Sequence, residues 1–175
     1  MTLNDDILAA PARLGDVRLV AIDGPSGSGK SVFADQLLAE LPDAVLVRTD
    51  DFATWDDPVS WWPRLVDGVF LPLSRGRPGR YQRTEWVDGH PRPGQHVDVR
   101  VPRILLVEGV SAGRRSIRPR LSSLVWCELP DRLARLARAV TRDGAESRQN
   151  LTNWQAFEAG WFVVDGTRPA AQHVR

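Results

Sequence analysis

The chain has 175 residues, of which 42% are hydrophobic and 26% are charged. This composition fits one folded domain, residues 1–175, and excludes a largely disordered protein. The 23 basic and 22 acidic residues leave a net charge of +1, so there is no electrostatic case for nucleic acid or an anionic membrane as a partner.

Segments of strand and helix character alternate along the chain. Short apolar runs bounded by turn residues predict buried strands, and apolar residues at spacings of three and four predict helices. The predicted strands are 17–22, 44–47, 104–107, 124–129 and 161–164, and the predicted helices are 31–41, 131–142 and 154–160. This alternation favours right-handed crossovers, so we predict an α/β fold with a mainly parallel five-stranded sheet between two layers of helices.

Residues 52–102 depart from this pattern, because they are rich in proline, glycine, arginine and tryptophan. Only a short helix near 61–69 is predicted within them. A structureless segment of this length is unusual in a compact domain, so we interpret it as an insertion that covers a substrate. Its tryptophans either stack on that substrate or form a small core under the loop, and the second interpretation is favoured; they are Trp55, Trp61, Trp62 and Trp86.

The cellular compartment is indicated by the amino terminus and the cysteine content. Residues 1–15 contain two aspartates ahead of any basic residue and no long apolar run, unlike a secretory signal. The single cysteine, Cys127, cannot form an internal disulfide, and its apolar neighbours suggest a buried thiol in a reducing compartment. No segment has the length of a bilayer-spanning helix. We expect a cytoplasmic protein with no membrane partner, and the sequence leaves a homo-oligomer open.

A phosphate-binding loop lies between the first predicted strand and the first predicted helix. Residues 24–31 form a complete G-x-x-x-x-G-K-S pattern in the order strand, loop, helix. Glycines let the backbone curl so that its N–H groups and the helix N-terminus face an anion. Lys30 is expected to reach the β- and γ-phosphates of a nucleotide, and the Ser31 hydroxyl to bind Mg²⁺. The remaining predicted binding residues are Gly24, Ser26, Gly27, Ser28 and Gly29.

Acidic residues follow two other predicted strands. Asp50 and Asp51 come after the second strand, and Glu108 follows the third. Ligands of parallel sheets gather at the carboxyl ends of the strands, so we expect Glu108 to help hold Mg²⁺. Asp50 or Asp51 is expected to accept a proton from an attacking hydroxyl and to help hold the metal. The alternative is that both are turn residues or a helix cap. If the strand continued, Asp50 and Phe52 would point to one side and Asp51 to the other.

Four segments together resemble the uridine kinase family of P-loop kinases. They are DGPSGSGKS (23–31), TDDF (49–52), LLVEG (105–109) and RLARAVTRD (135–143). The resemblance implies the three-layer sandwich of P-loop NTPases, with ATP and Mg²⁺ bound at the loop. It also implies that the catalytic base of the family's acid-x-Phe motif falls on Asp50.

In that family an arginine-rich helix and the lid after it clamp the triphosphate. The resemblance places this role on Arg138 and Arg142, with Arg148 as a looser candidate and residues 143–150 as the lid. Two positions differ from the family's pattern. Ala53 stands where a tyrosine is usual, and Thr84-Glu85-Trp86 replaces a Tyr-Asp-Phe stretch followed by a histidine. The phosphate-transfer residues therefore match the family's pattern better than the residues expected around the substrate do.

These features predict an enzyme that uses ATP and Mg²⁺ to phosphorylate a hydroxyl on a small molecule. Lys30, Asp50, Arg138 and Arg142 are the predicted catalytic residues, and residues 52–102 are expected to cover the acceptor. A nucleoside is the favoured acceptor. The alternatives are a kinase of a sugar acid, vitamin precursor or nucleotide, and a P-loop ATPase or nucleotide-sensing module that phosphorylates no small molecule.

Overall fold

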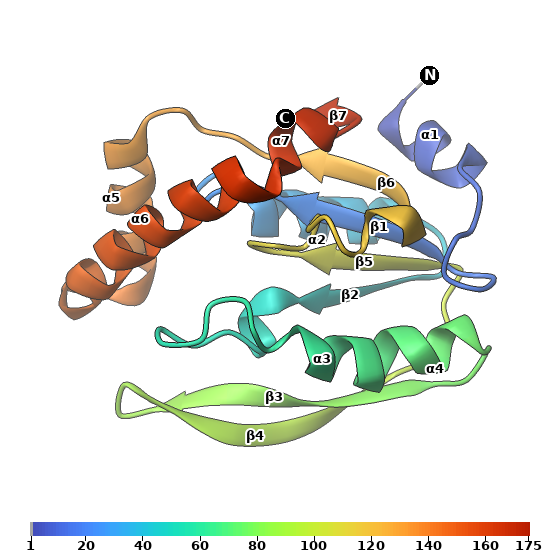
Figure 1. Ribbon diagram of the computed structural model, residues 1–175, viewed down its shortest axis with the longest axis horizontal. Coiled ribbons are helices and arrows are strands. Elements are labelled where there is room, and N and C mark those ends of the chain that lie inside the picture. Colours follow the sequence, from blue (N-terminus) through green and yellow to red (C-terminus); the bar gives the residue numbers. More distant parts are fainter. Residues whose placement is uncertain (1) are drawn as a thin grey trace.

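The computed structural model describes residues 2–175 and contains a five-stranded sheet. Its strands lie in the order β2-β5-β1-β6-β7, and each neighbouring pair is parallel (Figure 1). The predicted parallel sheet is therefore confirmed. The strands are β1 (Arg18–Asp23), β2 (Ala44–Arg48), β5 (Ile104–Glu108), β6 (Leu121–Trp126) and β7 (His173–Val174).

Hydrophobic residues of the central strands alternate between two separate cores. On β1, Leu19 and Ala21 belong to one cluster, whereas Val20 and Ile22 belong to the other, as the two-residue period of a strand requires. Every residue of β5 is buried. Strands buried on both faces are expected where a parallel sheet is covered on each side, so the chain forms three layers.

Different elements cover the two faces of the sheet. Helices α1 (Leu3–Ala9) and α2 (Lys30–Glu40) pack Ile7 and Leu37 against one face. The helical part of the insertion packs Trp62 and Phe70 against the other. In Figure 1 this helical part and the hairpin after it lie beside β2. The insertion is therefore part of the main hydrophobic core.

The insertion contains more regular structure than the sequence predicted. Its helical part consists of α3 (Trp62–Leu65), a π-helical turn (Val66–Phe70) and α4 (Leu71–Ser74). In the π turn, the N–H of Leu71 donates to the carbonyl of Val66, five residues earlier. Pro72 comes next and has no N–H to donate. The wider turn lets the helical run continue through this proline.

An antiparallel hairpin that the sequence analysis missed follows these helices. Strands β3 (Gly79–Val87) and β4 (His90–Val99) pair with each other. The turn residues Asp88 and Gly89 have φ values of 49° and 73°, as in the type I′ turn that Asp-Gly favours. Prolines within β4 obscured the strand pattern, but an edge strand tolerates them because one row of its N–H groups is unpaired.

The carboxyl-terminal part corrects one predicted strand. Residues 161–164 form the last full turn of α6 (Arg148–Asp165), and Val163 and Val164 are 84% and 77% exposed on that helix. A short apolar run does not distinguish a strand from a helix. The fifth strand is instead the two-residue β7 beside β6. The remaining helices are α5 (Arg132–Asp143), which was predicted, and α7 (Thr167–Ala170), which was not.

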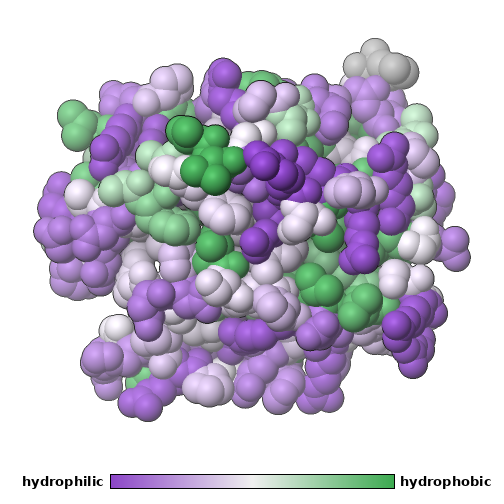
Figure 2. All heavy atoms as spheres, in the orientation of Figure 1, coloured by the Kyte–Doolittle hydropathy of each residue, from purple (hydrophilic) through white to green (hydrophobic). Residues whose placement is uncertain are grey.

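The surface mixes polar and apolar residues. On the face shown in Figure 2, hydrophobic residues lie in small groups between hydrophilic ones. Within residues 2–175, no helix has both the length and the apolar character needed to cross a membrane. Cys127 is free and buried, as predicted, and burial raises the pKa of its thiol to about 11.

Candidate active site

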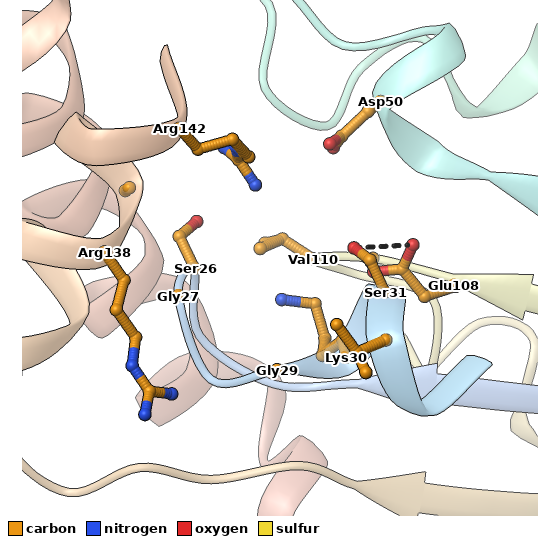
Figure 3. Close-up of a pocket in the computed structure, with 13 residues that line it drawn as sticks. Ser26, Gly27, Gly29, Lys30, Ser31, Asp50, Glu108, Val110, Arg138 and Arg142 are labelled. Carbon is orange, nitrogen blue, oxygen red and sulfur yellow. Dashed lines mark hydrogen bonds between the residues drawn. The ribbon is translucent and has the colours of Figure 1, made fainter. Parts of the chain in front are cut away.

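A cavity of about 270 Å³ opens at the carboxyl ends of the strands, where the sequence predicted ligand binding. We call it the phosphate-loop cavity (Figure 3). Its walls come from the loop after β1, the first turn of α2, the turn after β2, the end of β5 with the residues after it, and helix α5. The lining residues are Ser26, Gly27, Gly29, Lys30, Ser31, Val32, Asp50, Glu108, Gly109, Val110, Arg138, Ala139 and Arg142.

The loop has the shape of an anion cradle. Gly27 and Gly29 have φ values of 77° and 96°, which favour glycine. A Cβ on Gly27 would lie 2.5 Å from the carbonyl oxygen of Arg135, so only glycine lets α5 pack against the loop. A Cβ on Gly29 would meet nothing within 4 Å, because that side faces open space. Helix α2 then begins with no side-chain cap and no acid in its first turn, so its N-terminus is free to bind an anion.

Lys30 is buried at the floor of this cavity. Its Nζ donates to the carbonyl oxygen of Pro25 at 3.0 Å. Among the ion pairs of residues 2–175, none includes Lys30. A buried ammonium without a carboxylate partner is costly unless an anion binds beside it. The loop, the helix end and Lys30 therefore fit the phosphates of a nucleotide.

Ser31 and Glu108 lie side by side on the other wall. The Ser31 hydroxyl is 3.4 Å from both carboxylate oxygens of Glu108, as Figure 3 shows. Arg48 pairs with Glu108 at 3.1 Å and with Asp35 at 2.6 Å. Burial raises the pKa of Glu108, while the charges of Lys30 and Arg48 oppose that rise.

This donor set fits Mg²⁺ better than a transition metal. Among residues 2–175, no group of three or more His, Cys, Asp or Glu is placed to hold a metal ion. Mg²⁺ prefers oxygen donors and keeps waters, so one hydroxyl and one or two carboxylates together with nucleotide phosphates suffice. Ser31, Glu108 and Asp50 all line the cavity and are of this kind.

The structure separates Asp50 from Asp51. The chain leaves β2 at Arg48 and turns through a 3₁₀ segment, Thr49–Asp51, so the strand does not continue and its alternation does not apply. Asp50 lines the cavity and points toward Arg142 across it (Figure 3). Asp51 instead accepts a hydrogen bond from the hydroxyl of Tyr81 on β3. Both are turn residues, but only Asp50 lines the cavity.

Phe52 fixes the position of this turn. Its ring stacks on Trp61 at 5.1 Å and on Tyr81 at 4.7 Å between ring centroids. Phe52 is fully buried, so the turn that carries Asp50 is anchored to the insertion.

The predicted lid arginines occupy different positions. Arg138 and Arg142 on α5 both line the cavity. Arg142 reaches into the space between Ser26 and Asp50, whereas the guanidinium of Arg138 lies away from Lys30 (Figure 3). Arg142 also donates to Asp143 at 2.6 Å. Arg148, on the first turn of α6, is exposed and does not line the cavity.

Two predicted loop residues also lie outside the cavity lining. Gly24 has a φ of 144°, and a Cβ there would lie 2.0 Å from the carbonyl oxygen of Cys127. Its role in this arrangement is close packing against the end of β6. The hydroxyl of Ser28 is buried without a hydrogen-bond partner in the part of the chain described. A buried hydroxyl of this kind is free to bond to a phosphate oxygen bound in the loop.

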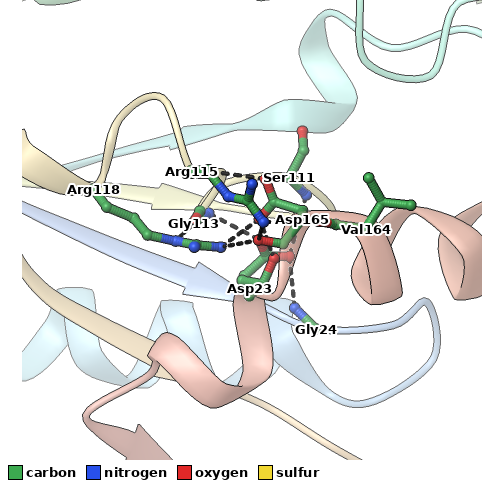
Figure 4. Close-up of polar contacts among 9 residues, drawn as sticks. Asp23, Gly24, Ser111, Gly113, Arg115, Arg118, Val164 and Asp165 are labelled. Atoms are coloured by element: carbon green, nitrogen blue, oxygen red, sulfur yellow. Dashed lines mark hydrogen bonds and ion pairs between the residues drawn. The ribbon is translucent and has the colours of Figure 1, made fainter.

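Asp23, which the sequence analysis did not select, ties the loop to the segment after β5. Its carboxylate accepts N–H bonds from Gly24 at 2.7 Å, Ser111 at 3.2 Å and Gly113 at 2.8 Å (Figure 4). Asp165 accepts from Arg115 and Arg118 nearby and so holds the end of α6 to the same segment. Burial raises the pKa of Asp23 to about 7, against the effect of these N–H bonds and of Lys30.

We expect the stability of the protein to depend on pH through Asp23. Its pKa is about 7 in the folded state against 3.8 ordinarily, so the folded protein keeps a proton that the unfolded chain loses. The resulting stabilisation is complete below about pH 4 and is lost as the pH rises through about 7. Relative to Asp23→Asn, the wild-type free energy of unfolding should fall by up to about 1.4 kcal/mol per pH unit in this window. Urea unfolding of both proteins tests this, and a difference independent of pH would contradict it.

Arg48 and Glu158 are two further site residues that the sequence analysis missed. Arg48 bridges Glu108 to α2, as described above. Glu158 on α6 is buried against the phosphate loop. A signal for Glu158 exists in the sequence, because it lies seven residues after Leu151 and three after Gln155, on one face of a helix. Polar residues at such inward positions indicate a specific partner.

A second cavity, of about 380 Å³, lies between the insertion and α6. Trp55 lies 5.9 Å from Trp154 and 5.7 Å from Trp86 between ring centroids. Trp61 and Trp62 are buried in the core, as the favoured interpretation held, whereas Trp55 and Trp86 are 38% and 41% exposed. We call this second cavity the aromatic cavity. Its lining residues are Trp55, Asp56, Pro58, Asn150, Asn153, Trp154 and Phe157.

Solved structures share this fold over nearly the whole chain. A possible uridine kinase from Bacillus stearothermophilus superposes with a TM-score of 0.68 at 18% identity, over 98% of this chain and 94% of that one. A protein from Silicibacter sp. TM1040, provisionally assigned as a fructose transport system kinase, gives a TM-score of 0.59 at 23% identity, over 91% and 95%. The chain thus has the α/β fold of P-loop kinases, as the motifs predicted.

Two curated proteins are similar in sequence to most of this chain and are named as pyrophosphatases. Inorganic pyrophosphatase TTM1 of Arabidopsis thaliana is 25% identical over 143 residues, which is 75% of this chain and 22% of that protein. Inorganic pyrophosphatase TTM2 of the same plant is 26% identical over 147 residues, 75% and 21% respectively. The chain therefore spans about a fifth of the length of these relatives. No protein-family model matches it.

Proposed function

We propose that the protein transfers the γ-phosphoryl group of ATP to a hydroxyl on a small molecule. The observation that carries the proposal is one cavity in which an unpaired buried lysine, a phosphate loop and the carboxylate of Asp50 face a common space. A phosphate loop alone supports nucleotide binding. The carboxylate opposite it adds a base for an acceptor hydroxyl.

In the proposed reaction, the acceptor oxygen bonds to the γ-phosphorus as the bond to the β-phosphate oxygen breaks. Asp50 takes the proton of the acceptor hydroxyl, and ADP leaves. Lys30 and Arg142 stabilise the charge on the transferring group. Ser31 and Glu108, with Asp50, would hold Mg²⁺, which supplies charge neutralisation at the phosphates when bound. The helical hairpin of α5 and α6, which includes residues 143–150, would act as the lid that excludes water.

The acceptor is proposed to bind between the insertion and the lid, and a nucleoside is the favoured class. Support comes from the aromatic cavity, whose tryptophans could stack on a flat ring while Asn150 and Asn153 bond to its edge. A sugar acid has no flat ring that would stack on these tryptophans. A nucleotide, or a vitamin precursor with a heterocycle, has such a ring, so both remain candidate acceptors in the experiment below.

The proposal is tested by measuring ADP release from Mg²⁺-ATP with a panel of nucleosides, nucleotides, sugar acids and vitamin precursors. We expect one class to stimulate release strongly, with a phosphorylated product and no stimulation in Lys30→Ala. Inorganic pyrophosphate belongs in the panel, because the curated relatives are named as pyrophosphatases. Release of phosphate from pyrophosphate with no phosphorylated acceptor would overturn the kinase proposal. ATP binding with no stimulated transfer would instead favour a nucleotide-sensing module.

A further inference from the structure

Glu158 forms a connection between α6 and the tip of the phosphate loop. Its side chain is 1% exposed. One carboxylate oxygen accepts the Ser26 N–H at 2.9 Å and the Ser26 hydroxyl at 2.8 Å, and the other oxygen accepts the same N–H at 3.1 Å. The two residues are 132 positions apart in the sequence. We propose that Glu158 is a positioning residue that holds the phosphate loop in its nucleotide-binding shape.

The chemistry of the contact favours a carboxylate. Ser26 presents two donors, its N–H and its O–H, and an ionised carboxylate is the one strong acceptor among side chains that does not also donate. Within residues 2–175, Glu158 forms no ion pair. The donors of Ser26 therefore satisfy this buried carboxylate, so the contact is costly to break.

Glu158 acts from outside the cavity. Ser26 lines the phosphate-loop cavity, but Glu158 does not. The carboxylate therefore binds the loop from the side of α6, away from the space proposed for phosphates. On the same stretch of α6, Gln155 accepts a hydrogen bond from Arg132, the first residue of α5, at 3.2 Å. Gln155 and Arg132 do not line the phosphate-loop cavity, so this contact joins the two helices away from the loop.

The same helix also reaches the aromatic cavity. Phe157, next to Glu158 in the sequence, lines that cavity from α6. Movement of α6 on closure over an acceptor would therefore be transmitted to Ser26 through Glu158. This inference rests on the proposed function only in taking the loop as the nucleotide site.

The test measures the dissociation constant of Mg²⁺-ADP by calorimetry for three variants and the wild type. Glu158→Ala should weaken binding about tenfold, as loss of a supporting partner behind a binding group does. Glu158→Gln keeps one acceptor oxygen but turns an NH₂ toward a donor, so its affinity should be intermediate. Gln155→Ala is the matched control, because it is 3% exposed, lies one turn earlier on α6 and does not touch the loop. It should lower the melting temperature and leave the ADP affinity within about twofold.

Each outcome decides between positioning and simple packing. Wild-type affinity in Glu158→Ala, or equal weakening in Gln155→Ala, would overturn the inference. If Glu158→Ala does not fold, Glu158→Gln and Ser26→Ala serve instead, and hydrogen exchange of the Ser26 amide should be faster in Glu158→Gln. Unchanged exchange with unchanged affinity would overturn the inference. Failure of the wild type to bind ADP would contradict the proposed function instead.

Discussion

Replacing Lys30 with alanine is expected to reduce phosphoryl transfer by about a thousandfold or more. Lys30 is buried in the phosphate-loop cavity, and its ammonium forms no ion pair with the described residues. The alanine variant keeps the glycines of the loop but removes the ammonium that lies buried at the floor of the proposed phosphate site. The measurement is the rate of acceptor phosphorylation at saturating Mg²⁺-ATP.

Lys30→Arg is the informative companion variant. It preserves the charge, but a planar guanidinium is larger than an ammonium and donates in a fixed fork. Lys30 is the single lysine beside 22 arginines, so this site keeps an ammonium in a chain that uses arginine elsewhere. We expect Lys30→Arg to remain at least about a hundredfold impaired. Either variant with more than a tenth of wild-type activity would contradict the assigned role, provided that circular dichroism shows both to be folded.

The phosphate loop was predictable because its geometry is encoded locally. Residues 24–31 are consecutive, and glycines at fixed offsets specify the turn that exposes the N–H groups. The strand before the loop and the helix after it were also predicted, because β1 and α2 show the apolar patterns of buried elements. Local rules therefore suffice for the part of the site that binds phosphate.

Contacts between distant parts of the chain were not predictable in this way. Glu158 meets Ser26 only because α6 folds back over the loop, and Arg48 meets Glu108 only because β2 lies beside β5. Neither residue belongs to a local motif. The sequence analysis placed Glu158 in a predicted helix, 154–160, and ended that helix at a predicted strand, 161–164, whereas α6 continues to Asp165. Nothing in the local pattern indicated which part of the chain this helix would meet.

The sequence predicted a short helix within the insertion but not its hairpin, and the hairpin was missed for a physical reason. Asp88-Gly89 is a strong turn signal between two strands. Two prolines in β4 and the many charged residues hid the alternation that usually marks a strand. The strands are held by pairing with each other and by Tyr81, which packs on Phe52. Tertiary contacts of this kind override weak local propensity.

The two neighbouring aspartates should respond differently to the same change. Asp50→Asn removes the proposed base without altering its size, so kcat should fall by about a hundredfold to ten-thousandfold. Asp51→Asn is the matched control, because its amide oxygen can still accept the hydrogen bond from Tyr81 and it does not line the cavity. It should keep kcat within about threefold and lower the free energy of unfolding by roughly 1 kcal/mol.

The affinity for Mg²⁺-ATP separates a base from a metal ligand at Asp50. A residue that only accepts the proton leaves nucleotide affinity nearly unchanged, since its contribution arises in the transition state. If Asp50 also holds Mg²⁺, the apparent Mg²⁺ affinity should weaken together with kcat. Full transfer rate in Asp50→Asn, or a large loss in Asp51→Asn with Asp50→Asn unaffected, would show that the base has been assigned to the wrong carboxylate. We expect the loss of kcat in Asp50→Asn and not in Asp51→Asn, because the 3₁₀ turn points Asp50 into the cavity and leaves Asp51 bonded to the hairpin.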